Sequence, residues 1–496
     1  MTVTQAALTL TDPRLFETRA YTNGRWIEGK DRFAVHDPAT DVLIAQVADM
    51  DVADTAAAID AAFQAQQDWA QRTGKERAKF LRRWFDLMTR NSEDLARILT
   101  AENGKPLSEA QGEILYGASY VEWFAEEAKR VYGDVIPGPE RDRRVVVLKQ
   151  PVGVVGSITP WNFPNAMIAR KAAPALAAGC TIVARPAEQT PLSALAMAVL
   201  ADRAGLPPGV FNVIPSQDAA GVGKELCRNP KVRKITFTGS TRVGQIMMEQ
   251  CAPTIKKLSL ELGGNAPFIV FDDADVDAAV EGAIMCKFRN NGQTCVCANR
   301  LYVAAPVYDA FAEKLATAVA ALRVGNGFDP ETTTGPLISE AAVQKVETHI
   351  ADATARGATV LCGGARLDQP QGTFFAPTVL TGATPDMTVC HEETFGPLAA
   401  LVPFKTEAEV TALANDSPYG LAAYVFTNDL ARSWRVSEAL ETGMVGVNTG
   451  LISTEVAPFG GVKQSGQGRE GSKYGIEDYV EIKGITFGGI PGAPVA

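Results

Sequence analysis

A cysteine and a glutamate, each in a glycine-containing segment, are the residues of this sequence best suited to covalent chemistry. Cys295 ends the run Gly-Gln-Thr-Cys at positions 292–295, and Glu261 lies in Leu-Glu-Leu-Gly-Gly at 260–264. A thiol can add to a carbonyl carbon, and a carboxylate can then activate the water that releases the acyl group. The glycine before Cys295 lets the backbone turn sharply, so that the thiol and a backbone N–H face the same carbonyl. The pair predicts covalent catalysis with Cys295 as nucleophile and Glu261 as base.

The elements expected to position these two residues alternate between strand and helix. From Gly153 onward, short apolar segments typical of strands are separated by segments with helical spacing. This alternation predicts a parallel sheet with helices on both faces. The expected strands are 154–159, 181–184, 210–214, 234–238 and 257–261, and the expected helices are 166–178, 191–204 and 241–251.

A second run of the same kind begins near residue 268. Its expected strands are 268–271, 398–404, 424–427 and 445–447, and its expected helices are 275–287 and 307–321. Upstream of both runs, Asn23-Gly24 predicts a hairpin at 21–26, and helical spacing dominates 51–131. The segment 132–151 contains prolines and glycines and then alternates weakly, which predicts paired strands that leave the helical body.

Length and composition restrict the class of protein. A chain of 496 residues predicts more than one domain, and 46% hydrophobic with 21% charged residues is typical of a globular protein with a large core. The formal charge of -10 argues against nucleic acid and against an anionic membrane surface as partners. No stretch approaches the ~20 apolar residues of a membrane span. We therefore expect no nucleic-acid partner and no membrane partner.

Cysteine and histidine usage indicates a reducing compartment and no metal. Eight cysteines are scattered along the chain, and residues 1–17 show no basic start followed by an apolar run. Reduced thiols in the cytoplasm are therefore expected. Three histidines, His36, His349 and His391, are too dispersed for a histidine-based metal site.

The turn at positions 238–241 is a candidate phosphate site. Thr-Gly-Ser-Thr there ends an expected strand and opens an expected helix. The free N–H groups and positive end of that helix favour a phosphate near Gly239 and Ser240. The spacing differs from the usual dinucleotide pattern Gly-x-Gly-x-x-Gly, so an ordinary strand–turn–helix connection is the alternative.

Two charged residues after a neighbouring strand bear on which nucleotide would bind. Glu188 can accept hydrogen bonds from ribose hydroxyls and would repel a 2′-phosphate, which favours NAD. Arg185 could hold that phosphate instead, which favours NADP. The sequence thus favours NAD through Glu188 and leaves NADP open, and solvated loop charge is the alternative for both residues.

In combination, the motifs resemble those of aldehyde dehydrogenases over residues 19–487. Within that family the sequence is most similar to succinate-semialdehyde dehydrogenases, through 288–300, 448–453 and 468–475. The family motifs are Pro-Trp-Asn-Phe-Pro at 160–164, the turn at 239–241, 260–264, 292–295, Glu-Glu-Thr-Phe-Gly-Pro at 392–397 and Pro-Phe-Gly-Gly at 458–461.

The resemblance implies roles for the catalytic residues. Cys295 would attack the aldehyde to give a thiohemiacetal, whose oxyanion the Cys295 backbone N–H and the Asn162 side-chain amide would hold. Such a donor is typically worth about 2.7–4 kcal/mol in the transition state. Hydride transfer would leave a thioester, and Glu261 would activate the water that hydrolyses it. The structural alternatives are a small buried residue for Cys295, a solvated strand end for Glu261 and a turn-forming residue for Asn162.

The resemblance also implies a cofactor cleft. Glu393 and Phe395 match the positions that hold the nicotinamide ribose and ring. Arginine stands at 185 where the family usually has lysine, which keeps the charge and changes its shape. The other positions that match the cleft are Trp161, Arg185, Glu188, Gly239 and Ser240.

The resemblance implies that Arg170, Arg289 and Ser453 bind the distal carboxylate of an acid aldehyde. Arginine grips a carboxylate through two parallel hydrogen bonds, which fits that role. The alternative is that both arginines form structural salt bridges. Glutarate semialdehyde is an alternative substrate, because one methylene discriminates by only ~1–3 kcal/mol.

A second cysteine, Cys297, follows the nucleophile closely. An oxidised Cys295–Cys297 pair would switch the enzyme off. The favoured interpretation is a small packing residue, because short loops seldom meet disulfide geometry.

The fold implied by the resemblance is α/β, with two parallel α/β domains and a small β element for oligomerisation. The expected division is 1–131 with 152–262 for NAD(P) binding, 263–476 for catalysis, and 132–151 with 477–496 for assembly into a homodimer or homotetramer. Two further functional alternatives are a family member without catalysis and a thiol esterase that needs no cofactor.

Overall fold

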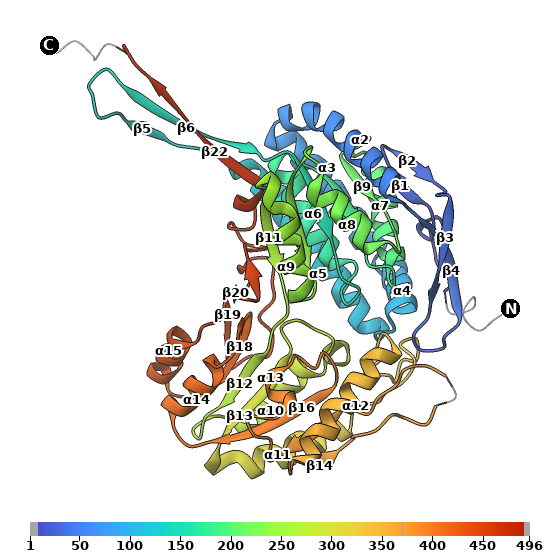
Figure 1. Cartoon of the computed structure of the whole chain (residues 1–496), viewed down its shortest axis with the longest axis vertical. Coiled ribbons are helices and arrows are strands. Elements are labelled where there is room, and N and C mark those ends of the chain that lie inside the picture. The colour runs from blue at the N-terminus through green and yellow to red at the C-terminus, as the bar shows by residue number, and fades with distance from the viewer. Residues whose placement is uncertain (1–7, 370, 491–496) are drawn as a thin grey trace.

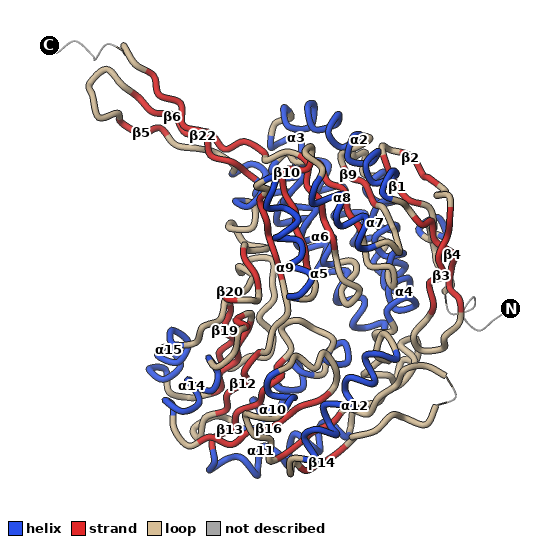
Figure 2. Tube along the Cα trace, in the orientation of Figure 1, coloured by secondary structure: helices blue, strands red, loops and turns tan. Residues whose placement is uncertain are grey.

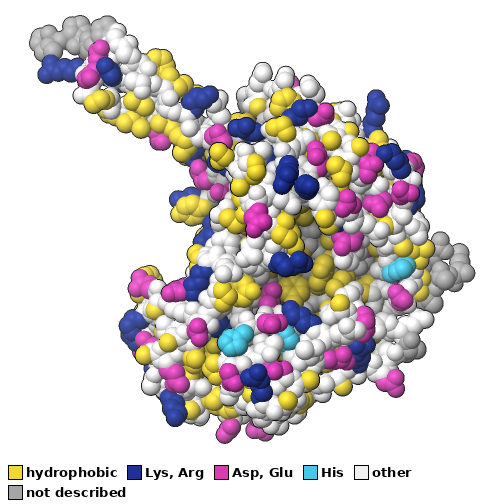
Figure 3. Space-filling view, in the orientation of Figure 1, with side chains coloured by type: hydrophobic (Ala, Val, Ile, Leu, Met, Phe, Trp, Pro, Cys, Tyr) yellow, Lys and Arg dark blue, Asp and Glu magenta, His cyan; other side chains and the backbone are white. Residues whose placement is uncertain are grey.

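The structure, a computed structural model, describes residues 8–369 and 371–490. Figure 1 shows two α/β bodies, one above the other, and a long arm that leaves the upper body. In the space-filling view the face between the bodies is hollowed, with apolar side chains on its floor (Figure 3). The ends of the expected domain ranges, 1–7 and 491–496, lie outside the described residues.

The upper body contains an eight-stranded sheet in the order β2-β1-β9-β8-β7-β10-β11-β21. Its five inner strands are parallel, as predicted, and the strands at both edges are antiparallel. The edge hairpin turns at Asn23 and Gly24, both at positive φ, as a two-residue hairpin turn requires. The strands are β1 Ala20–Thr22, β2 Arg25–Ile27, β7 Val154–Ile158, β8 Thr181–Arg185, β9 Phe211–Val213, β10 Val232–Thr238, β11 Lys257–Glu261 and β21 Gly466–Gln467.

Helices cover this sheet, and one of them was not predicted. The helix α8 follows β9, where two glycines within ten residues weaken the helical signal. The helix α6 is buried along its whole length and leads directly from the segment at 160–164. The helices are α2 Val52–Gln71, α3 Gly74–Arg90, α4 Ser92–Asn103, α5 Leu107–Glu127, α6 Ala166–Ala178, α7 Pro191–Arg203, α8 Ala219–Arg228 and α9 Thr241–Cys251.

The lower body contains a seven-stranded sheet in the order β14-β15-β16-β13-β12-β18-β19. All neighbours are parallel except β14. The strands are β12 Ala266–Val270, β13 Ala298–Ala304, β14 Thr359–Cys362, β15 Thr378–Thr381, β16 Leu398–Phe404, β18 Ala422–Phe426 and β19 Met444–Val447. The helices are α10 Val276–Lys287, α11 Tyr308–Ala320, α12 Glu340–Ala355, α13 Thr388–His391, α14 Glu407–Asn415 and α15 Leu430–Ala439.

The buried strand β13, which starts just after Cys297, was not predicted. Asn299 and Arg300 interrupt its apolar pattern, although every residue of the strand is buried. Both side chains bond to backbone carbonyls: Asn299 donates to Glu392 at 2.9 Å, and Arg300 donates to Asn265 at 2.9 Å. Such hydrogen bonds offset the cost of burying polar groups, so polar residues here belong to a core strand.

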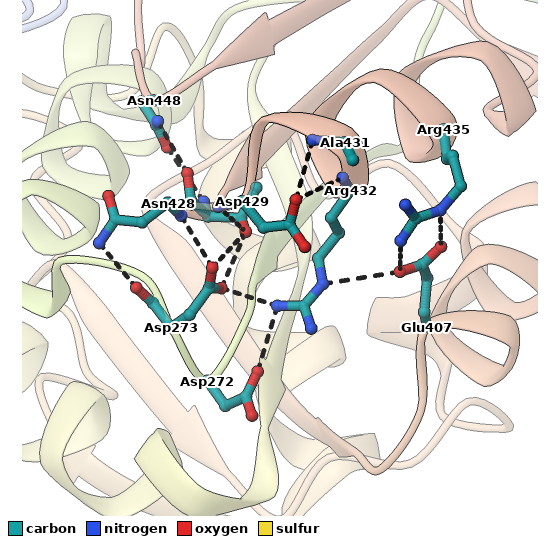
Figure 4. A network of polar contacts seen from close by, with 10 residues as sticks. Asp272, Asp273, Glu407, Asn428, Asp429, Ala431, Arg432, Arg435 and Asn448 are labelled. Carbon is teal, nitrogen blue, oxygen red and sulfur yellow. Dashed lines mark hydrogen bonds and ion pairs between the residues drawn. The ribbon is translucent and has the colours of Figure 1, made fainter.

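A polar network ties α14 and α15 to the end of β12 (Figure 4). Arg432 of α15 contacts Asp273 at 2.7 Å, Asp272 at 3.3 Å and Glu407 at 3.5 Å. Its guanidinium also lies 4.7 Å from the centre of the Phe271 ring. The network connects three segments that are far apart in the sequence.

The arm is a three-stranded antiparallel sheet in the order β22-β6-β5 (Figure 2). Its strands are β5 Val135–Pro137, β6 Arg144–Pro151 and β22 Val480–Phe487. The prediction of paired strands that leave the helical body is confirmed. Two further small sheets pair β3 Asp31–His36 with β4 Leu43–Asp49, and β17 Tyr419–Gly420 with β20 Val462–Lys463.

Within the described part of the chain, no helix combines the length and the apolar character needed to span a bilayer.

Candidate active site

The loop that carries Cys295 connects α10 to β13 and is wound into an unusual conformation. Asn290, Asn291 and Gly292 all have positive φ, at 50°, 55° and 74°. Asparagine and glycine are the residues that adopt this region most readily. A side chain at Gly292 would lie 2.2 Å from the Gly396 carbonyl oxygen, so only glycine fits. The sharp turn predicted before the nucleophile is therefore present.

The half-buried thiol of Cys295 lies in a wall of a cavity of about 260 Å³. Burial raises the pKa of the thiol to about 12, and the charge of Arg170 opposes that rise. Glu393 and Glu261 raise it further. The resting site therefore holds a neutral thiol, and a nearby base or bound cofactor must activate it.

Asn162 lies beside the nucleophile loop, although it comes from the β7–α6 connection in the other body. Its side-chain Nδ2 donates to the Gln293 carbonyl oxygen at 3.0 Å. A carboxamide nitrogen has two N–H groups, so one remains for a substrate oxygen. Packing thus brings two distant motifs, at 160–164 and 292–295, to one site.

Glu261 ends β11 with its carboxylate buried. Neither carboxylate oxygen has a hydrogen-bond partner in residues 8–369 or 371–490. Burial first, and the charge of Glu470 second, raise the pKa of Glu261 well above its usual value. A carboxylate with a raised pKa is a stronger base toward water, which fits the role expected from the sequence.

The two arginines expected to bind substrate differ in their surroundings. Both line the cavity, as does Ser453. Arg170 is buried and pairs with Glu470 at 2.6 Å, with its guanidinium 3.9 Å from the centre of the Phe459 ring. Arg289 has no carboxylate within 4.0 Å among the described residues, although its guanidinium lies 5.5 Å from the centre of the Phe163 ring. The salt-bridge alternative thus describes Arg170. Arg289 makes no ion pair within this distance in the described part of the chain, although its charge opposes the rise in pKa that burial causes at Glu109, another residue of the cavity wall.

Cys297 does not line the cavity formed by the described residues. Its buried thiol donates to the Lys287 carbonyl oxygen at 3.3 Å. All eight cysteines of the chain are unpaired in this structure. The arrangement fits the packing interpretation, and a Cys295–Cys297 disulfide stays a prediction.

The candidate phosphate site lies where β10 leads into α9. Ser240 caps this helix, because its hydroxyl accepts the Val243 N–H at 3.4 Å. A side chain at Gly239 would lie 2.4 Å from the Phe237 ring, so a larger residue there would require this ring to move. The predicted strand–turn–helix is present, with the N-terminus of α9 half-exposed to exposed.

Arg185 and Glu188, expected to act in opposite ways on a 2′-phosphate, contact each other. The Arg185 Nη2 donates to Glu188 at 2.7 Å and to the Ser216 carbonyl oxygen at 2.8 Å. Each charge is therefore partly neutralised by the other. Neither residue lines the cavity of Cys295: Arg185 is the last residue of β8, and Glu188 follows that strand.

Trp161 and Phe395 meet edge to face, with their ring centres 5.6 Å apart. Glu393 accepts the Gly264 N–H at 3.2 Å, and burial raises its pKa to about 7. This contact joins the loop after Glu261 to the loop at 392–397. The expected nicotinamide residues thus lie together at the junction of the two bodies.

Four buried charged residues near the site were not predicted. Glu470 pairs with both Arg170 and Lys171. Lys105 pairs with Glu113 at 2.6 Å in the cavity wall. A lone charged residue gives no local signal of burial, so periodicity and spacing could not have identified them.

Comparison with known proteins places this arrangement in a family. The model of the aldehyde dehydrogenase family matches residues 26–485. A glutarate-semialdehyde dehydrogenase from Pseudomonas aeruginosa is 60% identical, covering 97% of this chain and 100% of its own. A succinate-semialdehyde dehydrogenase (NADP(+)) from Escherichia coli is also 60% identical, covering 97% and 99%.

A solved structure agrees with the sequence comparisons. The crystal structure of succinate-semialdehyde dehydrogenase from Burkholderia pseudomallei is 61% identical and covers 97% of this chain and 100% of its own, with a TM-score of 0.96. The resemblance and the fold expected from the sequence motifs are confirmed. The chain belongs to the aldehyde dehydrogenase family.

Proposed function

We propose that this enzyme oxidises succinate semialdehyde to succinate with a pyridine nucleotide as hydride acceptor. The observation that carries the proposal is the position of Arg289, which lines the same cavity as the Cys295 thiol and makes no ion pair within 4.0 Å among the described residues. A short acid aldehyde fits a cavity of about 260 Å³ with a cation in one wall and a nucleophile in another. The relatives named for succinate and glutarate semialdehyde support this substrate class.

The chemistry begins with the thiol of Cys295. The thiol proton passes through a base to solvent as the sulfur forms a bond to the aldehyde carbon. The carbonyl oxygen becomes an oxyanion that the free N–H of Asn162 and the Cys295 backbone N–H hold. When bound, a nicotinamide ring supplies the acceptor for the hydride that leaves this carbon. Loss of the hydride leaves a thioester on Cys295.

Hydrolysis of that thioester requires a base. Glu261 removes a proton from water as the water oxygen attacks the thioester carbon. The carbon–sulfur bond breaks, the carboxylic acid is released, and the sulfur regains its starting state. One aldehyde and one water thus give one acid, with two electrons passed to the cofactor.

The residues at the carboxyl ends of the inner strands fit a nucleotide. The Thr159, Thr238 and Arg185 side chains each have a buried polar atom with no partner in the described chain. Nucleotides bind outside the carboxyl ends of strands in open α/β sheets. We propose that Gly239 and Ser240 hold phosphate and that Trp161, Glu393 and Phe395 hold the nicotinamide end.

The choice between NAD and NADP rests on the Arg185–Glu188 pair. Glu188 is half-exposed and favours a ribose with free hydroxyls. The bonds that Arg185 makes to Glu188 and Ser216 reduce its availability for a 2′-phosphate. We propose NAD as the preferred cofactor with NADP also accepted. The relative from Escherichia coli is named for NADP(+), so kcat/KM for each cofactor is the test.

Glutarate semialdehyde is the second candidate substrate. A relative named for it is as similar to this chain as the one named for succinate semialdehyde. One more methylene changes binding by only ~1–3 kcal/mol, so the two substrates are expected to differ in rate and not in mechanism.

Steady-state kinetics with matched aldehydes tests the proposal. We expect Arg289→Ala to lower kcat/KM for succinate semialdehyde by about 10–100-fold, as for a lost charge-assisted contact. Butanal, which lacks the carboxylate, serves as the control and should lose little. An equal loss for both substrates would refute the carboxylate contact. A Cys295→Ser variant that retains full formation of reduced nicotinamide at 340 nm would refute the covalent mechanism.

We propose three further assignments. The sheets support a nucleotide-binding domain at 1–131 with 152–262 and a catalytic domain at 263–476.

The arm at 132–151 with 477–496 exposes Val135, Ile136 and Ile482, which supports a homodimer or homotetramer. Replacement of Ile482 and Val135 by charged residues should therefore lower the molar mass of the assembly measured by light scattering.

Eight unpaired cysteines support a cytoplasmic location, which cell fractionation tests.

A further inference from the structure

A buried ion pair lies directly behind the turn that carries Asn162. Lys105 follows α4, and its Nζ lies 2.6 Å from Glu113 of α5 and 2.8 Å from the Asn162 carbonyl oxygen. Both side chains are only 1% exposed. The ammonium also lies 4.0 Å from the centre of the Phe163 ring. All three donors of this lysine are thus directed at Glu113 and at the segment 160–164.

Glu113 holds the other end of the same turn. While one carboxylate oxygen binds Lys105, the other accepts the N–H groups of Asn165 at 3.0 Å and Ala166 at 3.2 Å. Ala166 is the first residue of α6, where helix N–H groups lack partners within the helix. One ion pair therefore binds a carbonyl at the start of the turn and two amides at its end.

Bonds from the nucleophile loop complete the arrangement on the opposite side. Asn290 Nδ2 donates to the Asn162 carbonyl oxygen at 3.0 Å, and Asn162 Nδ2 donates to the Gln293 carbonyl oxygen at 3.0 Å. The backbone of Asn162 is thus held between Lys105 and Asn290, while its side chain is aimed at the residues before Cys295. Rotation of the turn would move that amide away from the thiol.

We propose that Lys105 and Glu113 are positioning residues that hold the Asn162 amide where the oxyanion forms. This inference rests on the oxyanion role of Asn162 in the proposed function. Neither residue touches the reacting atoms; they act through the backbone of the turn. Catalytic hydrogen bonds depend on placement, because an error of about 1 Å can cost ~10²-fold in rate.

A double-mutant cycle on kcat tests this indirect action. We expect Lys105→Met to lower kcat about 10–100-fold in the otherwise unchanged enzyme. In an Asn162→Ala background the same change should cost less than about threefold, because the group that Lys105 positions is already gone. Equal losses in the two backgrounds would overturn the proposal. Lys234→Met, which removes a buried lysine bonded to Ser259 far from the turn, is the matched control and should leave kcat unchanged.

Measurements with two aldehydes separate positioning from other roles of the pair. Lys105 lines the cavity, so a direct contact with the substrate carboxylate would raise KM for succinate semialdehyde and spare butanal. Positioning should instead lower kcat for both aldehydes. A loss confined to succinate semialdehyde would contradict the proposal.

A second variant covers the case in which Lys105→Met fails to fold. Removal of the lysine alone leaves Glu113 buried without its cation. The double substitution Lys105→Met with Glu113→Gln removes both charges and keeps an acceptor for the α6 amides. It should reproduce the loss in kcat, and wild-type kcat in this folded variant would refute the inference. If Asn162→Ala itself leaves kcat unchanged, the oxyanion role fails instead, so the two failures are distinguishable.

Discussion

Arg170 in the wall of the cavity lies beside Glu470, with Nη2 and Oε2 2.6 Å apart and both side chains almost fully buried. The other oxygen of Glu470 binds Lys171. One carboxylate thus neutralises two buried cations, and it does so next to Glu261. The charge of this carboxylate is the second cause, after burial, of the raised pKa of Glu261.

Removal of the Glu470 charge should destabilise the fold. Glu470→Gln leaves Arg170 and Lys171 buried without a counter-charge, which typically costs about 3–5 kcal/mol. Urea unfolding followed by fluorescence measures the change. Glu441→Gln, which removes an exposed partner of Lys463, is the control and should have a much smaller effect. A free energy of unfolding equal to that of wild type would show that the pair is not needed for stability.

The reactivity of Cys295 should depend steeply on pH in the cofactor-free enzyme. Because burial raises the thiol pKa to about 12, the thiolate fraction grows about tenfold per pH unit between 7 and 10. The alkylation rate by iodoacetamide, followed by mass spectrometry of the peptide that contains Cys295, should rise accordingly. A plateau near pH 9, as for a free cysteine with a pKa near 8.5, would contradict the raised value.

His349 should make the stability of the lower body fall in acid. Its ring contacts the Thr394 hydroxyl at 3.1 Å, and burial, followed by the charge of Lys345, lowers its pKa. The unfolded chain binds this proton near pH 6.5, and the folded protein binds it only at lower pH. The free energy of unfolding should therefore decrease as pH falls below about 6.5, with a slope of up to about 1.4 kcal/mol per pH unit from this one group.

The variant His349→Gln isolates that contribution. It cannot titrate, so its urea-derived free energy of unfolding should depend less on pH between 7 and 5. His36→Gln, at an exposed strand position, controls for the loss of a histidine. The same slope in wild type and His349→Gln would rule out this histidine as the source.

The network around Arg432 should stabilise the junction of α14, α15 and β12 (Figure 4). Arg432→Ala removes contacts to Asp272, Asp273 and Glu407 and the contact with the Phe271 ring. We expect the free energy of unfolding to fall by about 1 kcal/mol. The ion pairs are partly exposed and therefore contribute little, and the contact with the ring adds to them. Thermal unfolding measures it. Arg435→Ala removes contacts to Glu407 alone and should shift Tm less; a larger shift than for Arg432→Ala would contradict this interpretation.

The turns that carry the proposed catalytic residues could be predicted because their motifs are local. Gly292 is required by a backbone with φ of 74° and by the nearby Gly396 carbonyl, so the glycine marks the turn in the sequence itself. The strand–turn–helix at Gly239 and Ser240 and the hairpin at Asn23-Gly24 are likewise set by neighbouring residues. Hydrophobic periodicity was enough for most helices and strands of the upper body. In the lower body, α12, α13, α14, α15, β14 and β15 were also not predicted.

The strand β13 and the helix α8 could not be predicted from periodicity. In β13 the polar side chains of Asn299 and Arg300 are buried because distant carbonyls accept their hydrogen bonds. In α8 glycines weaken a helix that packing nevertheless stabilises. In both cases partners from elsewhere in the chain outweigh the local preference.

The sequence by itself determined the family and the turns that carry the proposed nucleophile and base, because short motifs encode each of these. Only the tertiary structure decided which charges are free. Arg170 pairs with Glu470 and Lys105 with Glu113, whereas Arg289 lines the cavity without an ion pair within 4.0 Å among the described residues. The sequence alone does not show whether an arginine is solvated, paired with a carboxylate or available to bind a substrate. Its partner can be hundreds of residues away, and only packing brings the two together.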